Sequence, residues 1–373
     1  MYYLHYLPVS NRKKTLKRRR EPMKRSFSIV FALLVMVSLV LAACAPAATP
    51  TEAPQPTEAA QPTQAVQPTE PPAPTEVPPT PEPELGTPDN PLIMALAPSA
   101  TTQELQTGGE AIAAKLSEMT GLTIKTVVPT NYAAMIEAMG AGQAHIGWLA
   151  PTQYVVAHGK GYADVALVTI RNGSDHYGFQ FVANAEAGFT PYYDVTTGKS
   201  TADAATALAQ FADKKPCWTD PLSSSGYVLP YGLLQANNVK VKAGAFVQGH
   251  PTVIKSVYLS PKGEICDFGA TFIDARSNVV NDFPDVNDKV VIIWVSDPFI
   301  PNDNVSFASS VPTELREKLT QALLDLAATE EGLTLLKNGG YSIQGLKEAD
   351  DTFYDEYRVY LEASGIDPTT LFK

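Results

Sequence analysis

The sequence has few of the residues from which metal centres are built. Among 373 residues there are three cysteines and five histidines. The histidines show no spacing typical of metal ligands, so we expect no bound metal. They are His5, His145, His158, His176 and His250.

Motifs of the common enzyme classes are also missing. The chain contains no GxSxG elbow and no HExxH, GxGxxG or P-loop motif, so we expect no cofactor and no enzymatic activity. One enzyme alternative stays open, because Ser224 and His250 could form the nucleophilic pair of an extracellular hydrolase. The sequence marks no acid that would orient such a histidine.

Basic residues become scarce once the N-terminus is set aside. The chain holds 28 Lys and Arg against 39 Asp and Glu, and residues 1–43 contain nine of the basic residues and one acidic residue. The remaining chain therefore carries a formal net charge of −19. Because a phosphate backbone is bound through basic patches, we expect no nucleic-acid partner.

The N-terminus has the pattern of a bacterial export signal. The segment Met23-Lys24-Arg25, with two basic residues, precedes an uncharged apolar run over 26–41, which is shorter than the roughly 20 residues that a membrane span needs. The run ends in Leu-Ala-Ala-Cys at Cys44, which resembles a lipobox. We expect a signal peptide over 1–43, with Met23 as an alternative start, and a lipid anchor on Cys44. An uncleaved membrane anchor is the alternative.

Proline is concentrated directly after this signal. Fifteen of the 31 prolines lie between Pro46 and Pro91, interleaved with Thr, Glu, Ala and Gln. Such a segment cannot bury enough apolar surface to fold, and proline favours extended polyproline II. We expect residues 44–90 to be a disordered spacer, about 100 Å long if fully extended.

From Pro91 onward, short apolar runs alternate with segments of helical spacing. This alternation predicts an α/β fold with parallel strands, built as two successive strand-helix-strand-helix-strand units. The expected strands are 92–96, 122–128, 145–149, 215–219, 243–247 and 266–272. Residues 313–337 and 350–364 have amphipathic helical spacing. We interpret 166–183 and 290–298 as crossovers between two lobes, and a single doubly wound sheet is the alternative.

Hydroxyl-bearing residues follow nearly every expected strand. The carboxyl ends of parallel strands gather ligand-binding residues, and helix N-termini attract anions. The candidates are Ser99, Thr101, Tyr132, Tyr154, Ser223, Ser224, Ser225 and His250. For each single loop, a plain helix cap is the simpler interpretation. The serine cluster at 223–225 exceeds the needs of a cap, and Gly226 permits close approach of the backbone.

Three of these residues have further alternatives. His250 follows a strand and precedes a helix, where it could donate to an anion oxygen, better when protonated. A lone histidine is otherwise usually structural. Tyr132 and Tyr154 could donate phenolic O–H groups, or they could be partial core.

Two cysteines remain after Cys44 is assigned to the lipid. Cys217 and Cys266 both lie at the start of expected strands of the second unit. An extracytoplasmic compartment permits disulfides. A Cys217–Cys266 disulfide and two buried free thiols both stay open.

Residues 91–373 resemble the periplasmic phosphonate-, phosphate- and phosphite-binding proteins of ABC importers, the PhnD-like group. The serine-rich loop and the Ile-Pro-Asn-Asp segment at 300–303 are the most specific matches. The segments that carry the resemblance are 131–139, 147–154, 220–227, 249–257, 267–271 and 300–303.

The resemblance implies a type II Venus-flytrap fold, in which two lobes close on a ligand. Lobe 1 would cover 91–180 plus 298–373 and lobe 2 would cover 183–292, with the two crossovers as hinge strands. It further implies an ABC permease as partner, and we expect the protein itself to be a monomer.

The resemblance also implies roles for individual residues. The phosphonate group would be held by Tyr132, Tyr154, Ser223, Ser224 and His250. In members that bind aminoalkyl phosphonates, acidic residues hold the ammonium group, and here Asp274 and Asp303 fall near those places.

The sequence departs from the family pattern at three places. Ser224 replaces the usual Thr, residues 259–262 look like a small insertion, and Asp297 precedes Pro298. These departures leave the organic tail of the ligand open. A binding protein for another small anion or metabolite, such as a sulfonate or a thiamine precursor, is the alternative. A sensor that presents its ligand to a membrane kinase would need the same site.

Overall fold

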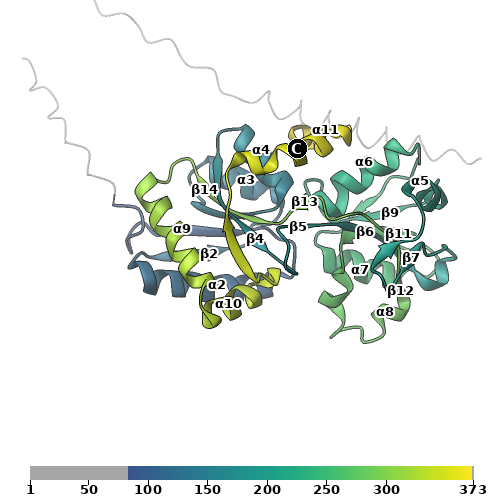
Figure 1. Ribbon diagram of the computed structural model, residues 1–373, viewed down its shortest axis with the longest axis horizontal. Helices are drawn as coiled ribbons and strands as arrows, with labels where there is room; N and C mark the ends of the chain where they lie inside the picture. The colour runs from purple at the N-terminus through teal and green to yellow at the C-terminus, as the bar shows by residue number, and fades with distance from the viewer. Residues whose placement is uncertain (1–82, 372–373) are drawn as a thin grey trace, which may run out of the picture. The chain divides into compact units, whose positions relative to one another are not determined.

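The computed structural model describes residues 83–371. The expected signal peptide, Cys44 and the spacer up to residue 82 lie outside the described residues. Within the described part, two β-sheets with flanking helices are joined by two chain crossovers (Figure 1). We call the half built on the six-stranded sheet the first lobe and the half built on the five-stranded sheet the second lobe.

The first lobe contains a mixed sheet with the strand order β15-β4-β14-β3-β1-β2. The strands β2, β1 and β3 run parallel, whereas β14 and β15 pair antiparallel with their neighbours. The strands are β1 (Leu92–Leu96), β2 (Ile124–Val127), β3 (Ile146–Leu149), β4 (Ala163–Ile170), β14 (Asn304–Ala308) and β15 (Gly345–Glu348).

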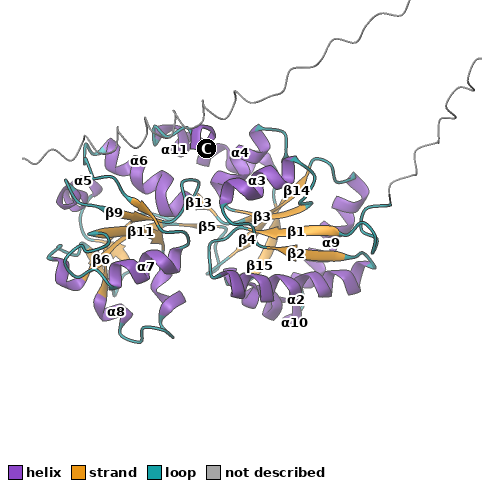
Figure 2. Cartoon of the chain, turned by 180° about the vertical axis from the view of Figure 1, so that it is seen from behind, coloured by secondary structure: helices purple, strands orange, loops and turns teal. Residues whose placement is uncertain are grey.

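Helices cover both faces of this sheet, with α2 and α10 on one face and α3 and α4 on the other (Figure 2). The helix α2 begins after Thr101, whose hydroxyl accepts the N–H of Glu104, and ends at Gly121 in the left-handed conformation. The helices of this lobe are α2 (Thr102–Thr120), α3 (Tyr132–Gly140), α4 (Pro151–Gly159), α9 (Thr313–Ala327), α10 (Glu330–Leu336) and α11 (Asp355–Ala363).

The second lobe contains a mixed sheet with the strand order β10-β9-β11-β6-β12. The strands β10, β9 and β11 run parallel, and β6 pairs antiparallel with β11 and β12. The strands are β6 (Phe179–Asn184), β9 (Pro216–Trp218), β10 (Ala245–Phe246), β11 (Phe268–Phe272) and β12 (Val290–Val295), with the hairpin β7 (Tyr193–Asp194) and β8 (Lys199–Ser200) beside them.

A disulfide joins two of the parallel segments of the second lobe. Cys217 on β9 is bonded to Cys266 just before β11, with a Cα–Cα distance of 5.6 Å. The helices of this lobe are α5 (Ala204–Leu208), a π-helical turn (Ser224–Val228) that continues into α6 (Leu229–Ala236), α7 (His250–Tyr258) and α8 (Val286–Lys289).

Two crossovers connect the lobes and pair with each other. One runs from β4 to β6 through β5 (His176–Tyr177), and the other runs from β12 to β14 through β13 (Ile300–Pro301). The strands β5 and β13 lie side by side between the lobes (Figure 1). They are antiparallel partners, with Tyr177 opposite Ile300. The second crossover lies later in the chain than expected, because all of β12 belongs to the sheet of the second lobe.

Three further features differ from the sequence-based expectations. Both sheets are mixed rather than fully parallel. In the first sheet β14 and β15 return from the C-terminal region to pair antiparallel with β4, and in the second sheet β6 runs antiparallel to β11 and β12. The helix expected over 313–337 is interrupted at Thr329, whose hydroxyl accepts the N–H of Gly332 and so starts α10.

The end of the expected spacer is also folded. Residues 84–90 form turns in which Leu85 packs against the core, and the N–H of Thr123 donates to the carbonyl of Gly86. The folded part therefore begins several residues before Pro91. Between residues 83 and 371, no helix combines the length and the apolar character that a membrane crossing requires.

Candidate functional site

A small cavity of about 30 Å³ lies between the two lobes. This volume admits a compact group of a few heavy atoms. The polar residues of its lining come from both lobes and from both crossovers. They are Ser99, Tyr132, Arg171, Tyr177, Ser223, Ser224, Ser225, His250, Asn278 and Asp303.

The first lobe presents the starts of its helices to this cavity. Tyr132 is the first residue of α3, and Ala150 immediately precedes α4. Both helices therefore direct the positive end of their dipoles toward the cavity. The second lobe approaches closely here, because the N–H of His250 donates to the carbonyl of Ser99 at 3.4 Å.

The serine cluster at 223–225 lies in the cavity wall and is buried. Ser223 Oγ accepts the N–H of Gly226 at 3.1 Å, which starts the π-helical turn. Ser225 Oγ accepts a hydrogen bond from the hydroxyl of Tyr177 at 3.4 Å. A Cβ atom on Gly226 would lie 1.9 Å from Thr219 Oγ1, so only glycine allows the turn to approach β9 this closely.

His250 is the first residue of α7 and lies buried against the cavity. Its Nδ1 accepts the N–H of Phe272 at 3.3 Å, so the proton of the neutral ring is on Nε2. Burial, together with the positive charge of Arg171, lowers the pKa of His250 to about 3. The neutral ring therefore keeps the donor capacity expected from the sequence through its Nε2–H, without the added strength that protonation would give.

This histidine makes stability depend on pH. The pKa is about 3 in the folded chain and about 6.5 in the unfolded chain, so the unfolded state binds the extra proton between these values. Stability from this group is therefore complete above pH 6.5 and is lost as the pH falls. Between pH 7 and pH 5 we expect His250 to account for a loss of about 2 kcal/mol in unfolding free energy.

Urea unfolding of the wild type and of His250→Asn at both pH values measures this loss. Asparagine keeps an acceptor for the N–H of Phe272 but does not titrate. A loss of equal size in the variant would show that His250 does not carry the pH dependence.

Arg171 is the cation of the cavity, and the sequence analysis missed it. Its Nη1 lies 3.2 Å from Asp303 Oδ2, and its guanidinium lies 5.7 Å from the ring centre of Phe272. Arg171 directly follows the apolar strand β4. The sequence signal that could have identified Arg171 is a basic residue at the end of an apolar run in an acidic chain. Tyr177 and Asn278 were missed as well, and neither follows a strand that was expected from the sequence.

The two aspartates that the resemblance implicated lie in different places. Asp303 lines the cavity, where burial raises its pKa and the Arg171 charge opposes that rise. Asp274 lies outside the lining and is paired with Arg276, whose Nε and Nη2 donate to it at 2.9 and 2.8 Å. Because this partner already neutralises it, the structure does not support a ligand role for Asp274.

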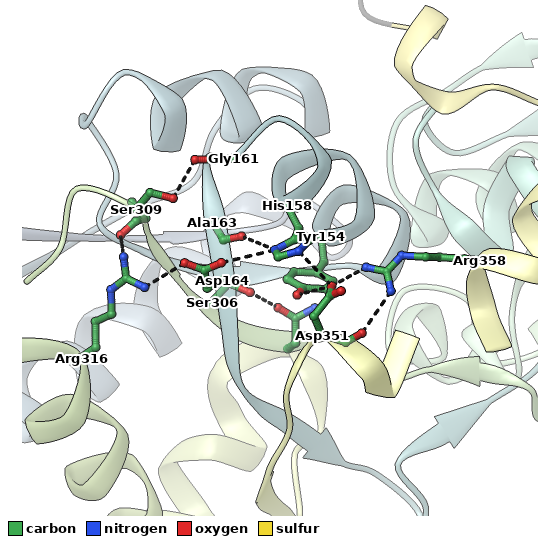
Figure 3. A network of polar contacts seen from close by, with 12 residues as sticks. Tyr154, His158, Gly161, Ala163, Asp164, Ser306, Ser309, Arg316, Asp351 and Arg358 are labelled. Atoms are coloured by element: carbon green, nitrogen blue, oxygen red, sulfur yellow. Dashed lines mark hydrogen bonds and ion pairs between the residues drawn. The ribbon is translucent and has the colours of Figure 1, made fainter. Parts of the chain in front are cut away.

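Tyr154 and Thr101 also lie outside the cavity lining. Tyr154 is buried on α4, and its hydroxyl donates to Asp351 at 2.8 Å in a network with His158 and Arg358 (Figure 3). Burial raises the pKa of Tyr154, so it stays a donor there. Thr101 is exposed and caps α2, as the simpler interpretation held. Because neither residue lines the cavity, the structure gives their expected ligand role no support, and that role stays a prediction.

The cavity thus combines one cation and one carboxylate with neutral donors. The neutral donors are the hydroxyls of the serine cluster and the Nε2–H of His250, and the Tyr177 hydroxyl supports them by donating to Ser225. Donors that converge from several directions suit a tetrahedral oxyanion. Within residues 83–371, no group of three or more His, Cys, Asp or Glu side chains is arranged to hold a metal ion.

Comparisons with known proteins agree with this geometry. Residues 94–354 match the family described as "ABC transporter, phosphonate, periplasmic substrate-binding protein". The phosphate-import protein PhnD of Mycolicibacterium smegmatis is 26% identical over 217 residues, which cover 55% of this chain and 63% of the relative. The chain thus matches less than two thirds of that relative's length.

Two solved structures share the fold. A binding protein component of an ABC phosphonate transporter from Pseudomonas aeruginosa has a TM-score of 0.61 at 18% identity, covering 73% of this chain and 87% of its own. PhnD1 from Prochlorococcus marinus, solved in complex with methylphosphonate, has a TM-score of 0.61 at 15% identity, covering 72% of this chain and 96% of its own.

The protein therefore has a type II periplasmic-binding fold. It belongs to the phosphonate family of periplasmic substrate-binding proteins of ABC transporters. The description of this family places its members in the periplasm as the substrate-binding components of ABC transporters.

Proposed function

We propose that this protein captures a phosphonate, phosphate or phosphite in the cavity between its lobes and delivers it to an ABC permease. The observation that carries the proposal is the cluster of Arg171, the serines 223–225 and neutral His250 around one small cavity. Each oxygen of a tetrahedral phosphorus oxyanion accepts hydrogen bonds. The cluster supplies both a charge and several neutral donors for them.

Binding and closure are coupled in this proposal. The ligand contacts come from both lobes and from the crossovers, so they form together only when the lobes are closed. The ligand then shifts an open–closed equilibrium toward the closed state. The first lobe runs to the end of β4 and resumes at β14, the second lobe runs from β6 to β12, and the two move about the β5–β13 crossovers. No chemical step is needed.

The anchor and the oligomeric state belong to the same proposal. A lipid on Cys44 holds the chain at the outer face of the membrane, and the proline-rich segment 45–82 lets the folded part reach a permease.

The protein acts as a monomer and carries no catalytic activity. In the described part, Ser224 Oγ bonds to Thr152 and His250 Nδ1 bonds to Phe272, which disfavours a Ser–His nucleophile.

Thermal unfolding of the purified, ligand-free chain tests the ligand class. The panel is phosphate, phosphite, methylphosphonate, 2-aminoethylphosphonate, sulfate and taurine. A ligand at about 100 times its Kd adds about 2.7 kcal/mol, which raises Tm by several degrees. We expect this shift for phosphorus compounds only, and we expect Ser224→Ala to reduce it because one donor is lost. A shift with sulfate or taurine alone would favour the alternative, a receptor for another small anion.

A further inference from the structure

A chain of three hydroxyls ties the two lobes together beside the cavity. The hydroxyl of Tyr357 on α11 lies 2.6 Å from Thr152 Oγ1 on α4. Thr152 Oγ1 in turn lies 2.8 Å from Ser224 Oγ in the second lobe. The backbone N–H of Thr152 also donates to Ser224 Oγ, at 3.2 Å. All three residues are buried.

The helix α4 depends on this contact for its cap. Its N-cap residue is Ala150, whose methyl group accepts no hydrogen bond, and its first residue, Pro151, has no N–H. The side-chain oxygen of Gln153 accepts the N–H of Ala150 at 2.9 Å, so it points back toward the residue that precedes the helix. The side-chain acceptor for the first N–H of α4 is therefore Ser224, which comes from the opposite lobe.

The hydrogen bonds at Ser224 restrict where its proton can point. A hydroxyl oxygen accepts up to two hydrogen bonds and donates one. Ser224 Oγ accepts the N–H of Thr152, and it accepts the Thr152 hydroxyl when Tyr357 donates to that hydroxyl. Both acceptor positions are then filled, and the proton of Ser224 is left for the cavity that this residue lines.

The phenol of Tyr357 is suited to begin this chain. Burial raises the pKa of Tyr357 to about 12, although its hydrogen bonds to Ser224 and Thr152 oppose the rise. The phenol therefore keeps its proton at neutral pH and acts as a donor. Hydrogen bonds that run in one direction strengthen one another.

We propose that Thr152 and Tyr357 are positioning residues for ligand capture, which hold Ser224 as the cap of α4 and turn its proton into the cavity. Neither residue lines the cavity. The orientation of the Ser224 proton toward a ligand rests on the proposed function. The tie between the lobes does not rest on it, so the two parts are tested separately.

Titration calorimetry of the full chain with methylphosphonate and with inorganic phosphate tests the effect on binding. Tyr357→Phe and Thr152→Val each remove one hydroxyl and keep the shape of the side chain. We expect each to raise Kd about tenfold, and we expect Thr152→Ser to stay within twofold of the wild type. Tyr354→Phe is the matched control, because it removes another buried hydroxyl that is not part of this chain, and its Kd should not change.

Hydrogen exchange of the ligand-free chain tests the tie without any ligand. We expect the amide of Thr152 to exchange about fivefold faster in Tyr357→Phe and at the wild-type rate in Tyr354→Phe. Unchanged exchange in Tyr357→Phe would overturn the tie, and unchanged Kd values would overturn the role in binding. If neither probe binds the wild type, the proposed function fails, and the exchange rates still decide whether Tyr357 supports the contact between the lobes.

Discussion

Replacing Arg171 with glutamine is expected to weaken the binding of phosphate and of methylphosphonate by about 100-fold or more. A charge-assisted hydrogen bond contributes about 1.5–3 kcal/mol, and each 1.4 kcal/mol corresponds to a factor of ten in Kd. The substitution also leaves Asp303 without the cation at 3.2 Å that now balances it. The remaining carboxylate would then repel an incoming anion.

Calorimetric titration of the variant measures this loss. Arg276→Gln is the matched control, because Arg276 is also paired with an aspartate but lies outside the cavity lining. We expect the control to bind with nearly the wild-type affinity. A Kd for Arg171→Gln within fivefold of the wild type would contradict the assignment of Arg171 as the main anion-binding charge.

A double substitution separates the loss of attraction by Arg171 from the repulsion by Asp303. In Arg171→Gln/Asp303→Asn, the attraction and the repulsion are both removed. We expect this variant to bind better than Arg171→Gln alone and worse than the wild type. Equal affinities of the single and double variants would show that Asp303 does not repel the ligand.

Removing the disulfide is expected to cause the largest loss of stability. Cys217 and Cys266 are 49 residues apart, and closing a loop of that length in the unfolded chain corresponds to about 4 kcal/mol in the chain-entropy model. Both cysteines are fully buried, so Cys217→Ala/Cys266→Ala also loses some packing. Urea unfolding of the variant and the oxidised wild type measures the difference.

The same variant should still bind ligand at low temperature, since neither cysteine lines the cavity. Reduction of the wild type should lower Tm by a similar amount, and it should not change Tm in the variant. An unfolding free energy equal to that of the oxidised wild type would show that the bond contributes no net stability.

The parts of the fold that sequence patterns predicted are those built from local signals. The strands around β1 and β3 are continuous apolar runs, and α2 has both its cap at Thr101 and its stop at Gly121. The strands β14 and β15 were missed because they are short and pair with partners more than 130 residues away. Such pairing depends on long-range packing that no local pattern reveals.

The candidate site was predictable to a similar degree. Ser99, Tyr132, the serines 223–225, His250 and Asp303 were expected from the sequence, and all of them line the cavity. Arg171 and Tyr177 were missed because they lie in or beside a crossover, whose place is fixed by the pairing of β5 with β13. Tyr154 follows a strand as expected, but its ring turns into the helix packing around Asp351.

The crossovers carry Arg171, Tyr177 and Asp303, so in the proposed mechanism the segments that bend are also segments that contact the ligand. In an evolving or engineered receptor, the flexibility of the hinge and the preference for a ligand would not vary independently. An insertion in either crossover would alter ligand preference and the rate of closure in one step, whereas the exposed loops remain free to change. The serine loop shares this coupling, because Ser225 accepts the hydroxyl of Tyr177 on β5 and Ser224 caps α4 of the opposite lobe.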